Sequence, residues 1–257
     1  KIIFKVLKSM NVSIITSTFN NASTIEDCLE SIFSQTFLNI DILIIDGDSS
    51  DDTLLKIKKI SNKFNNIRVF SEKDKGIYDA LNKGVDLAKG DIIGFVHSDD
   101  FLASSEIISE IIKKISSENF DGVYGNLDYV KKNNTNKIVR KWKSCEFDYN
   151  LLKKGWMPPH PTFFIKKSVF KKHGLFNLNY SISADYDFML RILSDKSLKF
   201  GYIPKVITKM RVGGESNRSL KNIILKIKED YIIIKRNNIG NFLTLIRKNT
   251  SKFKQFF

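Results

Sequence analysis

Two stretches decide the fold: VSIITSTFN, residues 12–20, and IDILIIDGDSSDDT, residues 40–53. Each contains a run rich in β-branched residues, which predicts a strand over Val12 to Ser17 and another over Ile40 to Ile45. The second run has no polar alternation, so we expect it to be buried on both faces. Between the runs, Ser23 to Phe33 carries apolar residues at helical spacing. This strand–helix–strand order predicts a parallel βαβ unit.

The same alternation continues to about residue 100. It predicts helices over Thr53 to Ile60 and Ile77 to Ala88, and strands over Ile67 to Phe70 and Ile92 to Val96. The fold class is therefore α/β, with a Rossmann-like, mostly parallel central sheet flanked by helices. Later segments are predicted as strands around an Asn-rich turn between residues 121 and 142, a Pro-rich loop over 155–161, a helix over Ala184 to Leu193, and one or two strands interrupted at Pro204 between Lys199 and Val212.

The length of 257 residues suits one large α/β domain with an appendage. We predict a domain over residues 1–215 and a basic, amphipathic helical tail over 216–257. Half of the formal charge of +14 lies in the segment from Ser219 to Phe257, whose acidic residues are Glu229 and Asp230. The tail therefore differs in composition from the rest of the chain.

The two cysteines, Cys28 and Cys145, lie far apart and show no metal-ligand spacing. This argues against a disulfide framework and against a structural zinc site, so we expect the reducing environment of the cytoplasm. No apolar run approaches the roughly 20 residues that a membrane-spanning helix needs. The sequence thus predicts a soluble or peripheral protein.

Polar side chains follow all four predicted strands at their carboxyl ends: residues 16–20, 46–50, 72–76 and 99–100. In an open parallel sheet, ligands bind in the crevice beyond these ends. Asp99 and Asp100 offer the hard oxygen ligands that Mg²⁺ or Mn²⁺ prefers, although surface turns carry such pairs routinely. Carboxylates at neighbouring strand ends suit a nucleotide whose diphosphate is neutralised by a divalent cation.

Four motifs together are more specific than any one pair: VSIITSTFN, IDILIIDGDSSDDT, EKDKGIYDALNKGVDLAKGDIIGFVHSDD and ISADYDFMLRI. Through them the sequence resembles family 2 of the glycosyltransferases, which have the GT-A fold. The resemblance is strong from about Asn11 to Asp100 and weaker to about Ser216. It is closest to bacterial members that build surface polysaccharides such as O-antigen, capsule or lipooligosaccharide. It implies an inverting, metal-dependent transferase that moves a sugar from a nucleotide-sugar, with a UDP-sugar favoured, to an acceptor hydroxyl.

The resemblance also implies roles on the nucleotide side of the site. Ser17 and Phe19, with the adjacent Thr16, match positions that meet the nucleoside, and Phe19 replaces the usual tyrosine. Asp46 matches a carboxylate that recognises uracil or ribose. Asp74 either approaches the donor or only caps the helix that follows it.

On the reacting side, the resemblance implies that Asp100 is the direct ligand of Mn²⁺ or Mg²⁺. Asp99 shares the metal site and lies near the ribose and diphosphate. Asp185 matches the base that deprotonates the acceptor, and it begins a predicted helix remote in sequence from the metal ligands. Asp187 is the alternative base, but at i+2 it points to a different helix face.

Three further residues are candidates for donor or acceptor contacts. Tyr78, like Asp74, is a candidate to approach the donor sugar. His160, between two prolines, either contacts donor phosphate or acceptor or has a structural role. Arg211 precedes a Gly-Gly pair that resembles a flexible loop closing over the diphosphate, where an arginine would neutralise charge. The QxxRW signature of processive synthases is missing from this region, so we expect non-processive transfer.

The tail mixes Ile, Leu and Phe with Lys and Arg, which is typical of an interfacial helix on an anionic membrane. Expected partners are therefore a nucleotide-sugar donor, a glycan or polyprenyl-diphosphate-linked acceptor, and the inner face of the cell membrane. The alternative is that the tail packs on the domain or on a second copy in a homo-oligomer.

Two other functional classes fit part of the sequence. A sugar nucleotidyltransferase also places metal-binding Asp residues on an α/β sheet. It carries a Gly-rich basic loop after its first strand, however, where this chain has TSTFNNAS, residues 16–23. The positive charge suggests nucleic-acid binding, but no motif or aromatic-basic stripe appears in the domain, so we expect no nucleic-acid partner.

Overall fold

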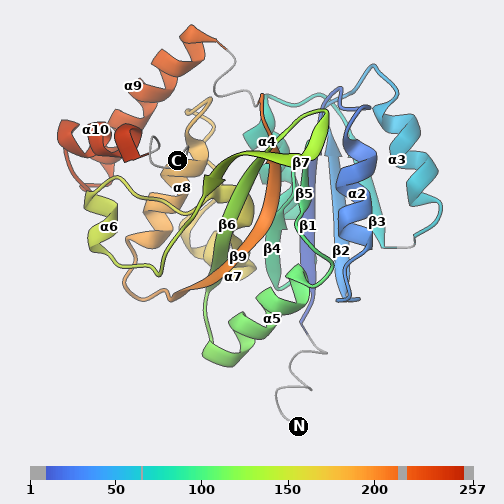
Figure 1. The fold of residues 1–257 in the computed structure, drawn as a ribbon, viewed down its shortest axis with the longest axis horizontal. Coiled ribbons are helices and arrows are strands. Elements are labelled where there is room, and N and C mark those ends of the chain that lie inside the picture. Colours follow the sequence, from blue (N-terminus) through green and yellow to red (C-terminus); the bar gives the residue numbers. More distant parts are fainter. Residues whose placement is uncertain (1–9, 65, 214–218, 252–257) are drawn as a thin grey trace.

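One mixed β-sheet organises the computed structural model, which describes residues 10–64, 66–213 and 219–251 (Figure 1). The strand order is β3-β2-β1-β4-β8-β6-β9-β5, with β7 paired to β6. The strands are β1 Val12–Thr18, β2 Ile40–Asp46, β3 Ile67–Ser71, β4 Ile92–Phe95, β5 Asp100–Leu102, β6 Gly122–Lys131, β7 Asn134–Trp142, β8 Phe164–Lys166 and β9 Phe200–Arg211. Strands β1, β2, β3, β4, β6 and β9 run in one direction and β5, β7 and β8 in the other, which confirms the mostly parallel sheet.

Helices cover both faces of this sheet (Figure 1). They are α2 Ile25–Phe33, α3 Thr53–Ser61, α4 Ile77–Leu87, α5 Ile107–Glu118, α6 Asn150–Lys153, the 3₁₀ turn η1 His160–Thr162, α7 Lys167–His173, α8 Ala184–Leu193, α9 Leu220–Arg236 and α10 Phe242–Thr250. Successive side chains of a strand point to opposite faces, so Ile14 of β1 packs with α2 and α5 while Ile15 packs with α4 and α8. All seven residues of β1 are buried, because both faces of the strand are covered.

Helix α5 and strand β5 were not predicted from the sequence. The helix buries one apolar stripe on the sheet, formed by Ile107, Ile108, Ile111, Ile112 and Ile115. Strand β5 is only three residues long and pairs antiparallel with β9. The alternation of helix and strand thus extends past residue 100.

Strand β9 continues through Pro204, so the predicted interruption is wrong. The ladder between β6 and β9 is shifted here: Tyr124 pairs with Tyr202 but Asn126 pairs with Val206. The extra residues of β9 form a bulge, and a proline is tolerated at a bulge because no ladder hydrogen bond is needed there.

The C-terminal helices α9 and α10 lie together at one end of the molecule, close to α8 (Figure 1). Ile233, Ile234, Ile239 and Leu245 are buried in the same apolar cluster as α4 and α8. One face of the tail therefore packs on the domain, whereas the domain boundary near residue 215 stays a prediction. No helix among the described residues is long and apolar enough to cross a membrane.

Candidate active site

The carboxyl ends of β1, β2 and β4 meet at one edge of the sheet, because the three strands are parallel neighbours. Thr18 at the end of β1 is in register with Asp46 at the end of β2. The Asn21 side-chain amide donates to Ser98 Oγ at 2.7 Å, which joins the loops after β1 and β4. Ser17 Oγ lies 3.1 Å from His97 Nδ1 across the same edge. The structure thus brings the first, second and fourth predicted strand ends together.

Asp100 is the most unusual side chain at this edge. It is fully buried, and neither carboxylate oxygen has a hydrogen-bond partner within the described part of the chain. Burial, and then the charge of Asp99, raises the pKa of Asp100 well above its usual range. A buried carboxylate without donors is costly unless a cation compensates it. These oxygens therefore suit a divalent cation.

No group of three or more His, Cys, Asp or Glu side chains that could hold a metal occurs among residues 10–64, 66–213 and 219–251. Asp99 and Asp100 alone supply two carboxylates. Mg²⁺ and Mn²⁺ are commonly held by one or two carboxylates together with phosphate oxygens and water. The donor set therefore fits a cation that arrives with, or is completed by, a nucleotide diphosphate.

Arg211 lies at the end of β9, not on a closing loop as predicted from the sequence. Its side chain is buried, donates to the Asp99 backbone carbonyl at 2.8 Å and forms an ion pair with Asp27. Its guanidinium also stacks over the Phe101 ring. These contacts hold the Arg211 guanidinium beside Asp99 from within the sheet. Gly214 of the predicted loop lies outside the described residues.

Two nucleotide-side candidates, Phe19 and Asp74, lie close together. Phe19 is 59% exposed at the end of β1. A Cβ added to Gly47 would lie 2.7 Å from Asp74 Oδ2 and 3.4 Å from Phe19 Cδ2, so the bare glycine separates the ring from the carboxylate. Asp74 also accepts from the Gly76 N–H at 2.8 Å, which fixes the turn before α4. An exposed ring beside a carboxylate suits a nucleoside.

Asp46 and Thr16 are buried deeper than these side chains. Asp46 is fully buried and accepts hydrogen bonds from the Ser49 N–H at 3.0 Å, the Ser49 hydroxyl at 2.6 Å and the Ser71 hydroxyl at 2.7 Å. A nucleoside contact through Asp46 would have to share or replace one of these bonds. Thr16 is fully buried in β1, so its hydroxyl reaches a ligand only if a neighbouring side chain moves.

Asp185 lies in the first turn of α8 and is fixed through one oxygen. Its Oδ1 accepts from the Tyr186 N–H at 2.8 Å and lies 3.1 Å from the Tyr78 hydroxyl. The same hydroxyl lies 2.6 Å from the Ile182 carbonyl oxygen, so Tyr78 links α4 to the turn before α8. Asp187 is buried and paired with Arg191 at 2.9 Å, which directs it away from Asp185.

Glu229 of α9 holds the same turn, and the sequence did not identify it. Its buried carboxylate accepts from three successive backbone N–H groups, those of Ser181 at 2.8 Å, Ile182 at 3.0 Å and Ser183 at 2.8 Å. Glu229 stands out in the sequence as an acidic residue among lysines, but the sequence does not show which groups it contacts. Helix α9 thus fixes the backbone that precedes Asp185 through Glu229.

His160 and His97 complete the floor of the site. Their ring centroids are 6.1 Å apart, and His160 also packs against Phe95 and Phe176. Burial lowers the pKa of His160 to about 4 and also lowers that of His97, while the charge of Asp185 acts in the opposite direction on both. His160 is therefore a neutral ring with a largely apolar setting.

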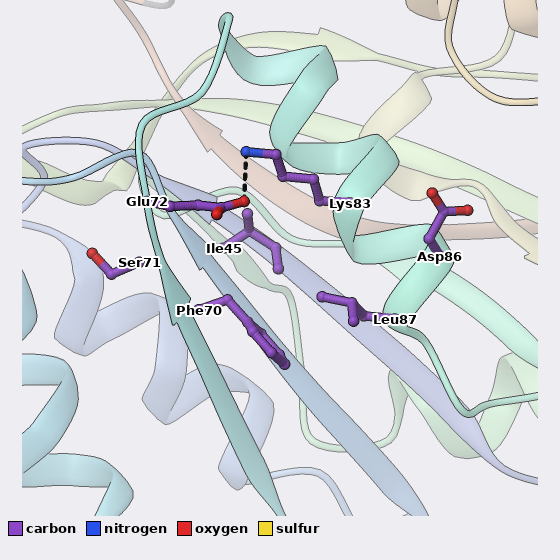
Figure 2. A pocket seen from close by; sticks show the side chains of 7 residues that line it. All are labelled: Ile45, Phe70, Ser71, Glu72, Lys83, Asp86 and Leu87. Atoms are coloured by element: carbon purple, nitrogen blue, oxygen red, sulfur yellow. Dashed lines mark ion pairs between the residues drawn. The ribbon is translucent and has the colours of Figure 1, made fainter.

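A hollow of about 420 Å³ lies between β3 and α4 (Figure 2). Ile45, Phe70 and Leu87 form its apolar wall, and the Glu72–Lys83 ion pair of 2.8 Å crosses it. None of the predicted site residues lines it. It adjoins the site at Asp46, which follows Ile45 in β2 and accepts a hydrogen bond from the Ser71 hydroxyl. Because the other predicted site residues lie elsewhere, we do not assign the donor to this hollow.

Comparison with known proteins places these features in a family. Residues 13–174 match the model of glycosyl transferase family 2. The PGL/p-HBAD biosynthesis glycosyltransferase of Mycobacterium bovis strain BCG is 33% identical over 221 residues, which cover 83% of this chain and 82% of the relative.

Solved structures share the fold at low sequence identity. The 1–349 segment of S. aureus TarS in complex with UDP-GlcNAc has a TM-score of 0.69 at 18% identity and covers 88% of this chain and 66% of that one. The mannosyltransferase PcManGT from Pyrobaculum calidifontis, in complex with GDP-Man and Mn²⁺, has a TM-score of 0.64 at 17% identity and covers 88% and 64%. These likenesses agree with a GT-A-like sheet, and the family match with the sequence relative shows that the chain belongs to glycosyltransferase family 2.

Proposed function

We propose that this glycosyltransferase is an inverting, metal-dependent and non-processive enzyme. It transfers a sugar from a nucleotide-sugar, a UDP-sugar in the first instance, to a hydroxyl of a glycan or polyprenyl-diphosphate-linked acceptor in surface polysaccharide biosynthesis. Its place of action is the inner face of the cell membrane, where it is peripheral. The sequence relative named for PGL/p-HBAD biosynthesis supports a surface glycoconjugate as product, and TarS supports a UDP-sugar.

One observation carries the proposal: two carboxylate sites of different character come from different elements, and the charges of Asp99 and Asp185 both act on the His97 ring to raise the pKa that burial lowers. Asp100 is buried without a hydrogen-bond donor among the described residues, at the strand edge that also holds Asp99. Asp185 comes from α8, is half-buried, and is fixed through Oδ1 by Tyr186 and Tyr78. The first arrangement suits a cation with a diphosphate, and the second suits a proton acceptor.

Inversion at the anomeric carbon requires one proton transfer and one displacement. The acceptor hydroxyl gives its proton to the Asp185 carboxylate while its oxygen bonds to the anomeric carbon. The bond from that carbon to the diphosphate breaks on the opposite face, and its electron pair leaves on the phosphate oxygen. A divalent cation bound by Asp100 and Asp99 would offset the charge that develops on the diphosphate. The contacts to Oδ1 of Asp185 leave Oδ2 for the acceptor.

The experiment is a screen of UDP-, GDP- and other nucleotide-sugars with Mn²⁺ and with soluble and lipid-linked glycan acceptors. Released nucleoside diphosphate measures turnover, and NMR of the product gives the anomeric configuration. We expect turnover with a UDP-sugar and inversion. Retention of configuration would overturn the mechanism, and turnover with a GDP-sugar alone would overturn the donor assignment.

The same assay tests the base. Asp185→Asn keeps the size of the side chain and its contact with the Tyr186 N–H but removes the proton acceptor. We expect kcat to fall by about 10²–10⁴-fold while donor affinity changes little. Asp187→Asn is the matched control, because it lies one half-turn away and pairs with Arg191, and it should retain turnover. Ordinary turnover of Asp185→Asn would contradict the assignment.

A further inference from the structure

Helices α9 and α10 expose an apolar face on the side opposite to the domain. This apolar face consists of Leu220, Ile224, Ile227 and Tyr231 on α9 and Phe242 and Ile246 on α10. Leu220 is 80% exposed, Ile224 68% and Phe242 61%. Single exposed apolar residues are ordinary, but a contiguous group of them marks an interaction site. The α9 members recur at intervals of four, three and four residues and so form one stripe along the helix.

The two helices present this face as one rigid surface. The rings of Tyr231 and Phe242 meet edge to face with centroids 6.2 Å apart, which makes the stripes of α9 and α10 continuous. On the inner side, Ile233 and Ile234 are fully buried against the domain. The Asp230–Lys248 ion pair, itself buried, joins α9 to α10. The apolar face is therefore held in place from beneath.

The exposed charged side chains of residues 219–251 are all positive. Lys221, Lys228 and Lys235 recur at every seventh residue and are exposed, so they form one row along the edge of the stripe. The acidic residues of residues 219–251 are Glu229 and Asp230, and both are buried on the inner side. The outer surface of the two helices thus combines apolar side chains with a row of cations.

We propose that this face binds the surface of a lipid bilayer that contains anionic headgroups. Apolar side chains at the centre with lysines at the edge suit insertion between headgroups, with the lysines at the level of the phosphates. The face suits a second copy of the chain less well than a membrane. Pairing two copies would bring their lysine rows together, and α9 and α10 expose no carboxylate that could pair with those lysines.

The bound orientation would place the helix that positions the base next to the membrane. Glu229 lies on the same helix as the apolar face and fixes the turn before Asp185. A lipid-linked acceptor would then be held near the helix that positions the base. This use of the binding rests on the proposed function, whereas the binding itself does not.

The experiment sediments the full chain with vesicles of phosphatidylcholine alone or mixed in equal parts with phosphatidylglycerol. We expect binding to the mixed vesicles and little to the neutral ones. The triple variant Leu220→Ser, Ile224→Ser, Ile227→Ser should bind at least about tenfold more weakly. Lys221→Gln, Lys228→Gln and Lys235→Gln should each weaken binding by roughly fivefold.

Leu38→Ser with Leu55→Ser is the matched control, because these leucines are 88% and 67% exposed elsewhere on the molecule. Equal binding by the triple variant and the wild type would overturn the proposal. A wild-type dimer that the triple variant converts to a monomer, with no vesicle binding, would assign the face to a second copy instead. Nucleoside diphosphate release with a soluble acceptor, measured on the same variants, separates failure of docking from failure of the proposed function.

Discussion

Asp100 combines a proposed role in metal binding with a cost in stability. Its carboxylate is buried beside Asp99 without a hydrogen-bond donor from the described residues. The neutral variant Asp100→Asn should therefore raise the free energy of unfolding of the metal-free protein by about 1–3 kcal/mol. The same change should abolish the increase in Tm that Mn²⁺ and UDP together produce in the wild type.

Thermal unfolding with and without Mn²⁺ and UDP measures both effects. Asp48→Asn is the control, because Asp48 is an exposed carboxylate after β2 and its φ of 66° is one that asparagine tolerates. A Mn²⁺-dependent increase in Tm that survives in Asp100→Asn would show that the cation is held elsewhere.

His160 makes stability depend on pH. Burial lowers its pKa from 6.5 to about 4, so between these values the unfolded chain binds a proton that the folded chain does not. Stability therefore falls as pH is lowered through this range, by up to about 3 kcal/mol. His160→Leu should flatten this part of the curve in urea unfolding measured at several pH values. Parallel curves for variant and wild type would contradict a buried neutral ring.

Residue types at strand ends could be predicted from the sequence, but their surroundings could not. Asp46, Asp99 and Asp100 follow recognisable apolar runs, so their place at one edge follows from parallel topology. The partners of Glu229 lie 46 to 48 residues earlier in the chain, and no local pattern specifies such a contact. The sequence predicts a loop at Arg211 because the glycines that follow it are a local signal. The contacts of Arg211 with Asp27 and Asp99 are long-range and leave no such signal in the sequence.

At the scale of elements, α9 and α8 act together through Glu229. We expect Glu229→Ala to lower kcat about tenfold or more, because three backbone N–H groups before Asp185 lose their acceptor. Glu229→Gln keeps one acceptor oxygen and should recover part of the rate. The KM for the donor should change little, since the strand edge that holds Asp99 is separate.

Steady-state kinetics with donor binding measured in parallel checks this expectation. Glu118→Ala is the control, because that residue forms an exposed pair with Lys114 on α5. A fall in donor affinity that matches the fall in kcat would indicate general unfolding and would contradict a positioning role for Glu229.

Regular elements were predicted well where their pattern is local. The strands β1 to β4 begin at the predicted residues, because runs rich in β-branched residues follow polar or glycine-containing turns. The path of β9 depends on its partner: a Cβ on Gly125 of β6 would lie 2.8 Å from the Lys205 carbonyl oxygen, so the bulge at Pro204 needs this glycine. A bulge set by two strands about 80 residues apart cannot be read from one of them.

At the scale of the whole molecule, the tail contributes to the main core. Ile233, Ile234, Ile239 and Leu245 together bury enough apolar surface to contribute roughly 6–12 kcal/mol, which is comparable to the total stability of an ordinary domain. A chain that ends at residue 215 should therefore aggregate or unfold at a much lower Tm. Calorimetry of the shortened chain checks this, and a folded monomer with the wild-type Tm would instead support an independent domain over residues 1–215.

The contact between Glu229 and the turn at Ser183 also orders events during synthesis. The aspartates at the strand edge leave the ribosome first, and Asp185 follows later. The carboxylate that holds Ser183 is made another 46 residues afterwards. At about 5–20 residues per second, the nascent chain spends roughly 2–9 seconds with Ser183 translated but without the carboxylate that holds it. A growing chain thus contains the proposed base for some seconds before it contains the side chain that positions it.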